Sequence, residues 1–196
     1  TATLSAATSS QTRVSFDPSG TAELIGDYLV SNMSNEGKVA ATIVGGNGPG
    51  SAANQFHYPW DVAVDASGNI YIADFDNYRI QKWAPGDTTG TTVAGGNGYG
   101  SAANQFATRG VAVDASGNVY IADNGNHRIQ KWAPGATEGV TVAGGNGYGS
   151  AANQLENPSG VAVDAAGNVY IADTNNDRIQ KWAPGASEGT TVAGGN

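Results

Sequence analysis

Short apolar runs separated by glycine-containing turns recur along most of this chain. Residues 69–74 read Asn-Ile-Tyr-Ile-Ala-Asp, in which both alternating sets of side chains are apolar. A strand with two apolar faces is buried on both sides, so this pattern predicts a strand enclosed between two layers. Residues 62–65 before it and 79–83 after it predict two neighbouring strands, joined to it through tight turns. A fourth strand is expected at 91–94.

This four-strand pattern returns at a nearly constant spacing. The segment at 62–74 recurs at 111–123 with one change and at 161–173 with two changes. Three aspartates anchor the copies: Asp65, Asp114 and Asp164. The period is therefore 49 and then 50 residues. Four short strands at this period are the signature of a β-propeller blade.

Residues 158–182 combine Pro-x-Gly-Val-Ala-Val-Asp, Gly-Asn-Val-Tyr-Ile-Ala-Asp and Asn-x-Arg-Ile-Gln-Lys-Trp. This combination resembles the NHL repeat, and the resemblance extends over residues 41–196. It implies an all-β array of three four-stranded propeller blades, with one extra strand at Ala41–Val44. The second copy lacks one residue and the proline in its loop at 106–110, so that loop is expected to differ.

Residues 1–40 lack the repeat and predict a separate β-rich segment. The run at 15–28, with Gly-Thr-Ala and Asp-Tyr, resembles the middle of a Calx-beta domain, which is a β-sandwich. The flanking strands of that sandwich are missing, and unpaired strand edges are templates for another chain. Two interpretations remain: the segment pairs with a neighbouring protomer, or it is part of a larger domain cut at this point.

Composition and charge restrict the partners. The chain has 29 glycines, only 13% charged residues and a formal net charge of −8, which disfavours nucleic acid and anionic membrane surfaces. No stretch approaches the roughly 18 apolar residues of a membrane span. Cysteine is absent, which excludes disulfides and thiolate metal sites. The cysteine-free composition, rich in Gly, Ser, Thr and Asn, favours an extracellular or cell-surface protein of a bacterium.

The sequence offers no evident catalytic set. The two histidines, His57 and His127, lie at different positions within their repeats, so a transition-metal site is not expected. The turn that begins at Asp65 resembles a calcium loop but lacks the further acidic ligands. The sequence therefore predicts a protein that is not an enzyme and that has no cofactor and no metal.

Each copy carries an aspartate and an arginine on either side of a tight turn, and their equal spacing predicts structural ion pairs rather than a site. The pairs are Asp74 with Arg79, Asp123 with Arg128, and Asp173 with Arg178. Outside the repeats, Asn32 fits an N-glycosylation sequon.

The residues that differ between copies are the candidates for function. In propellers, the loops between strands two and three and those between blades share one face. In the first copy these loops carry an aromatic cluster that predicts a contact surface: His57, Tyr58, Trp60, Phe75 and Tyr78. The surface could take a protein or a sugar ring, and we expect a protein. NHL proteins that bind RNA use a basic version of this face, whereas here Asp61, Asp76, Glu156 and Asp177 oppose Arg109.

Three blades are too few to close a ring, since propellers of this type close with about six. If each bare blade face exposed roughly 400 Å² of apolar area, the missing contacts would total on the order of 20 kcal/mol. The sequence therefore predicts a homo-oligomer or polymer, a structural protein that self-associates through its blade faces and residues 1–40. The alternative is a propeller that binds a glycan or protein ligand through the aromatic contact surface.

Overall fold

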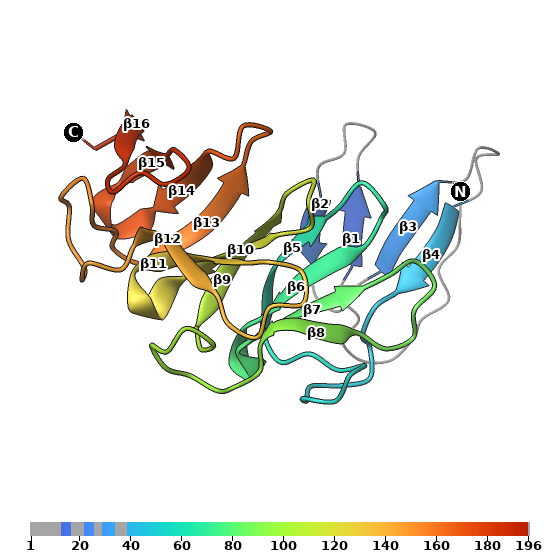
Figure 1. The fold of residues 1–196 in the computed structure, drawn as a ribbon. Coiled ribbons are helices and arrows are strands. Elements are labelled where there is room, and N and C mark those ends of the chain that lie inside the picture. Colours follow the sequence, from blue (N-terminus) through green and yellow to red (C-terminus); the bar gives the residue numbers. More distant parts are fainter. Residues whose placement is uncertain (1–12, 17–21, 26–28, 34–38, 196) are drawn as a thin grey trace. The chain divides into compact units, whose positions relative to one another are not determined.

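The structure, a computed structural model, describes residues 13–16, 22–25, 29–33 and 39–195 (Figure 1). The chain divides into two compact units, residues 1–48 and residues 49–196. The first unit contains two antiparallel strand pairs, β1 (Arg13–Phe16) with β2 (Ala22–Ile25) and β3 (Leu29–Met33) with β4 (Val39–Ile43). The strand expected at 41–44 as an extra strand of the blade array is β4, which begins two residues earlier and pairs with β3 instead of joining a four-stranded blade. Asn32 lies in β3, and residues 1–12 lie outside the described residues.

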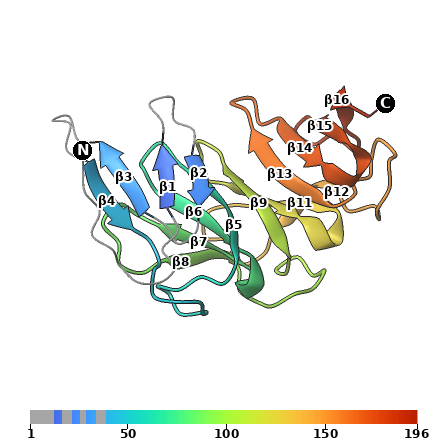
Figure 2. The same cartoon turned by 180° about the vertical axis from the view of Figure 1, so that it is seen from behind.

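The second unit consists of three four-stranded antiparallel sheets, with the strands of each sheet in chain order (Figures 1 and 2). Blade one contains β5 (Pro59–Val64), β6 (Ile70–Asp74), β7 (Arg79–Trp83) and β8 (Thr91–Gly95). Blade two contains β9 (Thr108–Val113), β10 (Val119–Asp123), β11 (Arg128–Trp132) and β12 (Val140–Gly144). Blade three contains β13 (Pro158–Val163), β14 (Val169–Asp173), β15 (Arg178–Trp182) and β16 (Thr190–Gly194). The predicted fold class, an all-β array of three NHL-type blades, is confirmed.

A short 3-10 turn joins the second and third strands of every blade. These turns are η1 (Phe75–Asn77), η2 (Asn124–Asn126) and η3 (Thr174–Asn176). Each is followed by a residue in the left-handed backbone region, and none of these residues is glycine: Tyr78, His127 and Asp177. The first strands β5, β9 and β13 contact one another in sequence, so they form the inner row of the array.

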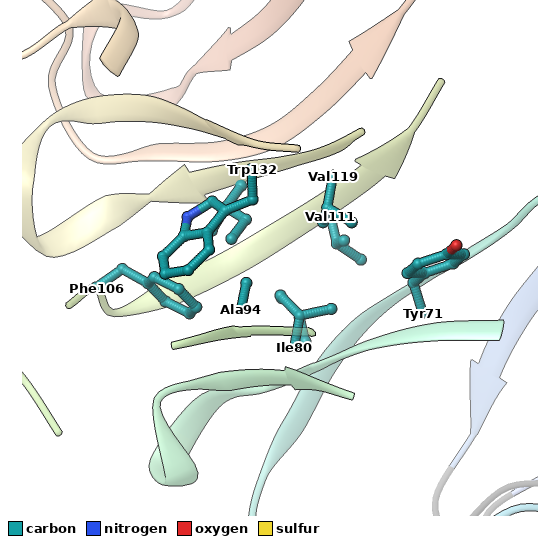
Figure 3. Close-up of a cluster of buried hydrophobic side chains, with 9 residues drawn as sticks. Tyr71, Ile80, Ala94, Phe106, Val111, Val119 and Trp132 are labelled. Atoms are coloured by element: carbon teal, nitrogen blue, oxygen red, sulfur yellow. The ribbon is translucent and has the colours of Figure 1, made fainter. Parts of the chain in front are cut away.

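The core lies between blades rather than within them. Tyr71, Ile80 and Ala94 of blade one pack against Phe106 and Trp132 of blade two, together with neighbouring valines (Figure 3). All five residues of β6 and of β10 are buried, as expected for strands with two apolar faces. A second cluster of the same composition joins blade two to blade three. Each blade is therefore stabilised chiefly by its neighbours.

Blades two and three each insert one apolar side chain into a hollow on the face of the preceding blade. Phe106 and Leu155 occupy the same place in their repeats, and both are fully buried. A Cβ atom at Gly95 would lie 2.5 Å from the Phe106 ring, and one at Gly144 would lie 2.9 Å from Leu155. Glycine is required at both positions because they also have positive φ angles, +72° and +67°. We call Phe106 and Leu155 the plug residues.

The loop before blade two is one residue shorter than the other two loops. It lacks their residue with left-handed backbone geometry, and the pairing of the strand that follows does not shift. In blades one and three that residue is Tyr58 (φ 49°) or Asn157 (φ 50°). Blade two has no counterpart, yet Thr108 still lies opposite Asp123. In blade one, Pro59 lies opposite Asp74 in the same way. The loop differs, as the sequence predicts, and the register is retained.

Candidate functional site

The aspartate at the end of the second strand is the centre of a buried polar network. In blade two, Asp123 is fully buried and accepts a hydrogen bond from Arg128 Nε at 2.7 Å. It also accepts from Asn126 Nδ2 at 2.9 Å and from the backbone N–H of Ala107 at 3.0 Å. Arg128 in turn donates to the Gln105 carbonyl of the preceding loop. Burial raises the pKa of Asp123, against the opposing effect of these donors.

The same pair recurs in blades one and three, with 2.7 Å between Arg79 and Asp74 and between Arg178 and Asp173. Each pair lies within its own blade, and each arginine binds carbonyls of its own preceding loop. The three networks therefore do not converge on one site. Their position indicates that they hold the loop between blades against the turn that follows the second strand.

A second set of aspartates closes the turns between the first and second strands. Asp114 accepts hydrogen bonds from the side chain and backbone of Asn118, from the Ser116 backbone and from the Tyr120 hydroxyl. Burial opposes ionisation, but these four donors together lower the pKa of Asp114 below its usual 3.8. The pKa values of Asp65 and Asp164 are lowered in the same kind of turn.

These turns are expected to make the protein sensitive to acid. A carboxyl group with a lowered folded-state pKa stabilises the fold above its unfolded value of 3.8, and this contribution is lost as the pH falls through the lower value. Asp114→Asn should therefore lower the melting temperature at neutral pH, with a difference from the unmodified protein that shrinks below about pH 3.8. Thermal melts between neutral pH and strong acid measure this. Glu138→Gln, at an exposed position, is the control; an Asp114→Asn difference that stays constant with pH would contradict the assignment.

The aromatic residues singled out from the sequence do not form one cluster. His57 contacts Tyr58 with 5.1 Å between ring centroids, and Trp60 contacts Phe75 at 5.7 Å. Tyr78 instead contacts Tyr99 at 6.0 Å. The structure therefore arranges the predicted contact surface as three separate aromatic pairs, and Tyr99 belongs to it although the sequence analysis missed it. Tyr58 and Trp60 are the most exposed of the five, at 68% and 49%.

Two residues beside Trp60 were not recognised as site residues from the sequence. The Arg109 guanidinium lies over the Trp60 ring, 4.9 Å from its centroid. Asp61 bridges the two inner strands, because its carboxylate accepts from the Val62 backbone and from the Val111 backbone, both at 2.9 Å. Burial raises the pKa of Asp61 despite these two hydrogen bonds. A signal was present in the sequence, since Trp-Asp, Arg-Gly and Ser-Gly occupy the same place in three otherwise similar repeats.

Grooves occur at the other end of the inner strands, between adjacent turns. The groove between blades one and two has a volume of about 720 Å³ and is lined by Asp65, Tyr71, Lys82 and Asp114, among others. Lys82 Nζ lies 5.5 Å from the centre of the Tyr71 ring. A smaller groove of about 360 Å³ repeats this chemistry between blades two and three. These grooves follow from the repeat itself.

In the part of the chain that the structure describes, no group of three or more His, Cys, Asp or Glu side chains is placed to hold a metal ion. The same residues contain no helix long and apolar enough to cross a membrane.

Solved structures with the same fold include enzymes. A streptogramin B lyase is 12% identical, with a TM-score of 0.57 over 93% of this chain and 54% of the lyase chain. A gluconolactonase from Xanthomonas campestris is 16% identical, with a TM-score of 0.55 over 71% of this chain and 48% of its own. A protein of unknown function from Bacteroides thetaiotaomicron is 18% identical, with a TM-score of 0.56 over 93% and 47%. The chain thus spans about half the length of these structures. No curated protein matches it.

The prediction that this chain is not an enzyme is wrong as an inference from sequence. The lyase and the gluconolactonase are enzymes of the same propeller fold, so the lack of an evident catalytic set in the sequence does not exclude catalysis.

The family comparison agrees with the blade boundaries. The NHL repeat model matches residues 56–83, 109–132 and 155–182, which in each blade include the first three strands. The Calx-beta resemblance of the N-terminal segment is not supported by the comparisons and stays a prediction. The three segments that match the NHL repeat model, residues 56–83, 109–132 and 155–182, each fold as part of a four-stranded β-propeller blade.

Proposed function

We propose that this chain is a protein-interaction scaffold that associates with further copies of itself through the outer face of blade three. We define the outer face of blade three by the residues that follow the pattern of the buried interfaces: Ala172, Ile179, Val192 and Ala193. The extracellular or cell-surface location stays a prediction from composition.

The observation that carries the proposal is the exposure of apolar positions that are buried in the other blades. Ile80 and Ile129 are fully buried between blades, whereas the equivalent Ile179 is 36% exposed. Ala94 and Ala143 are buried, whereas the equivalent Ala193 is exposed. An apolar face built for an interface favours association when it meets a complementary surface.

The outer face also contains an unfilled counterpart of the plug hollow. Ala172, Ile179, Ala193 and Gly194 line a hollow of about 240 Å³. In blades one and two the same place is filled by Phe106 and Leu155. The hollow therefore fits an apolar side chain from another β-rich unit. A second copy of this chain can supply such a side chain.

We place the first unit of the second copy on this face, in a head-to-tail arrangement. Among the described strands of that unit, β1 pairs only with β2, and β3 pairs only with β4. Two-stranded sheets are marginally stable in water and gain from further packing. Because the contact joins two different surfaces of the chain, each added copy leaves a free surface for the next one. This arrangement gives a fibre, or a ring if it closes on itself.

Light scattering after size-exclusion chromatography, over a wide range of concentration, tests the proposal. The unmodified chain should exceed its monomer mass of 19.8 kDa, and Ile179→Lys should return it to a monomer. Val140→Lys is the matched control, because Val140 is an exposed apolar residue of blade two (67%) that lies outside the outer face of blade three. Val14→Pro in β1 should weaken assembly as well, since proline disrupts strand pairing. A folded monomer at every concentration, or an Ile179→Lys chain that still assembles, would overturn the proposal.

A further inference from the structure

The three repeats differ in sequence near the start of their inner strands. Because these strands are adjacent, side chains of different types lie next to one another there. The first strand of each blade carries Trp60, Arg109 or Ser159 at the same place, and adjacent inner strands contact each other. The turn after the second strand carries Phe75, Asn124 or Thr174. We call this set of six residues the variable row.

Arg109 is the unusual member of the variable row. Arg79, Arg128 and Arg178 each pair with a buried aspartate, whereas no carboxylate pairs with Arg109 among the residues that the structure describes. The Nε atom of Arg109 is buried and has no hydrogen-bond partner there. A guanidinium has five N–H donors and no acceptor; the buried Nε is out of reach of a ligand, so an external acceptor would take its hydrogen bonds from the Nη atoms of Arg109.

The carboxylate of Asp61, which follows Trp60 in the same strand, already accepts hydrogen bonds from the backbone. Both carboxylate oxygens of Asp61 accept backbone hydrogen bonds, from Val62 and from Val111. Asp61 therefore joins the inner strands of blades one and two rather than pairing with Arg109. The Trp60 ring lies against the face of the guanidinium, and stacking on that face leaves the donors in the plane of the group free to bind a planar anion.

We propose that Arg109 and Trp60 form a binding site for a carboxylate-bearing ligand. The planar guanidinium binds the carboxylate through two parallel hydrogen bonds. Trp60, which is 49% exposed and contacts Phe75 at 5.7 Å, covers the apolar part of the ligand. On the other side, Ser159 Oγ and Thr174 Oγ1 lie 2.5 Å apart and present a polar wall.

A single carboxylate suits this site better than a polyanion. The net charge of −8 repels nucleic acid and other chains of phosphates, whereas one anionic group interacts mainly with the nearby cation. The carboxylate has two possible sources with the same chemistry, an acidic sugar and the side chain of glutamate. Trp60 and Arg109 lie in blades one and two, whereas Ile179, which the self-association test replaces, lies on the outer face of blade three.

Tryptophan fluorescence provides a reporter for the test. Trp83, Trp132 and Trp182 are at most 3% exposed, so a ligand that lands on the row changes chiefly the emission of Trp60. Glucuronate and N-acetylglutamate are the two probes. Glucose and N-acetylglutamine are the uncharged controls, and inorganic phosphate is the anion control. At least one carboxylate probe should cause a saturable change that its uncharged control does not cause. A response to only one probe identifies the source.

Variants assign the response to Arg109. Arg109→Gln should abolish it, and Arg109→Lys should weaken it by roughly tenfold because an ammonium cannot make the bidentate contact. Lys82→Gln, at the other end of the inner strands, is the control and should bind normally. Trp60→Phe should remove the fluorescence signal. The monomeric Ile179→Lys variant should still bind, which separates this test from the previous one. Equal binding of uncharged or phosphate probes, an unaffected Arg109→Gln, or the lack of any saturable response would overturn the proposal.

Discussion

Asp123→Ala is expected to destabilise the protein by about 3–5 kcal/mol. The substitution leaves three donors without their acceptor in a buried position: Arg128 Nε, Asn126 Nδ2 and the Ala107 backbone N–H. An unpaired buried charge costs more than the loss of one neutral hydrogen bond. Arg128 also loses its orientation toward the Gln105 carbonyl, so the loop before blade two is weakened as well.

Urea unfolding followed by tryptophan fluorescence measures this effect. Glu138→Ala is the control, because Glu138 is an exposed residue of the same blade, and it should change the free energy of unfolding by less than about 0.5 kcal/mol. Asp173→Ala removes the equivalent network of blade three and should show a loss of similar size. A loss below about 1 kcal/mol for Asp123→Ala would show that the network is not a stabilising element of the blade.

Phe106→Ala is the second substitution with a large expected effect, about 3–5 kcal/mol. Phe106 fills the hollow at Gly95 and contacts Trp132 with 6.0 Å between ring centroids. Alanine leaves a cavity between blades one and two that the surrounding glycine and alanine residues cannot fill. The loss therefore combines the lost burial of the ring with the cost of the cavity.

Exchanging the plug residues provides the matched control. Leucine occupies the equivalent position of blade three as Leu155 and is fully buried there. Phe106→Leu should therefore cost less than about 1.5 kcal/mol. The reciprocal Leu155→Phe tests whether the second hollow accepts the larger ring. If Phe106→Ala and Phe106→Leu had the same small effect in denaturant unfolding, the plug residues would not be central to the interface between blades.

Most of the fold could be predicted from the sequence, because the repeat carries it in local patterns. The run Ile70–Asp74 has two apolar faces, and the structure buries both. The turns and the period locate four strands in each blade, and all twelve blade strands lie close to their predicted positions. The single-residue deletion before blade two was visible in the sequence, whereas its consequence, the loss of a left-handed residue at constant register, required the backbone geometry.

The candidate site could be predicted only in part. Trp60 and Phe75 were identified from the differences between repeats and do contact each other. Arg109 was treated only as one charge of the face, because it is 49 residues away from Trp60 along the chain. Its unpaired guanidinium becomes evident only when the inner strands of blades one and two lie side by side.

The sequence by itself determined the blades, since periodic burial and turn chemistry act over a few neighbouring residues. Only the tertiary structure decided what lies between blades. It revealed the Phe106 and Leu155 plugs, the bridge from Asp61 to the Val111 backbone and the stacking of Arg109 on Trp60. These contacts join residues from different repeats, and near-identical repeats carry no local signal for which partner each side chain meets. Packing and hydrogen bonding across the interface select those partners.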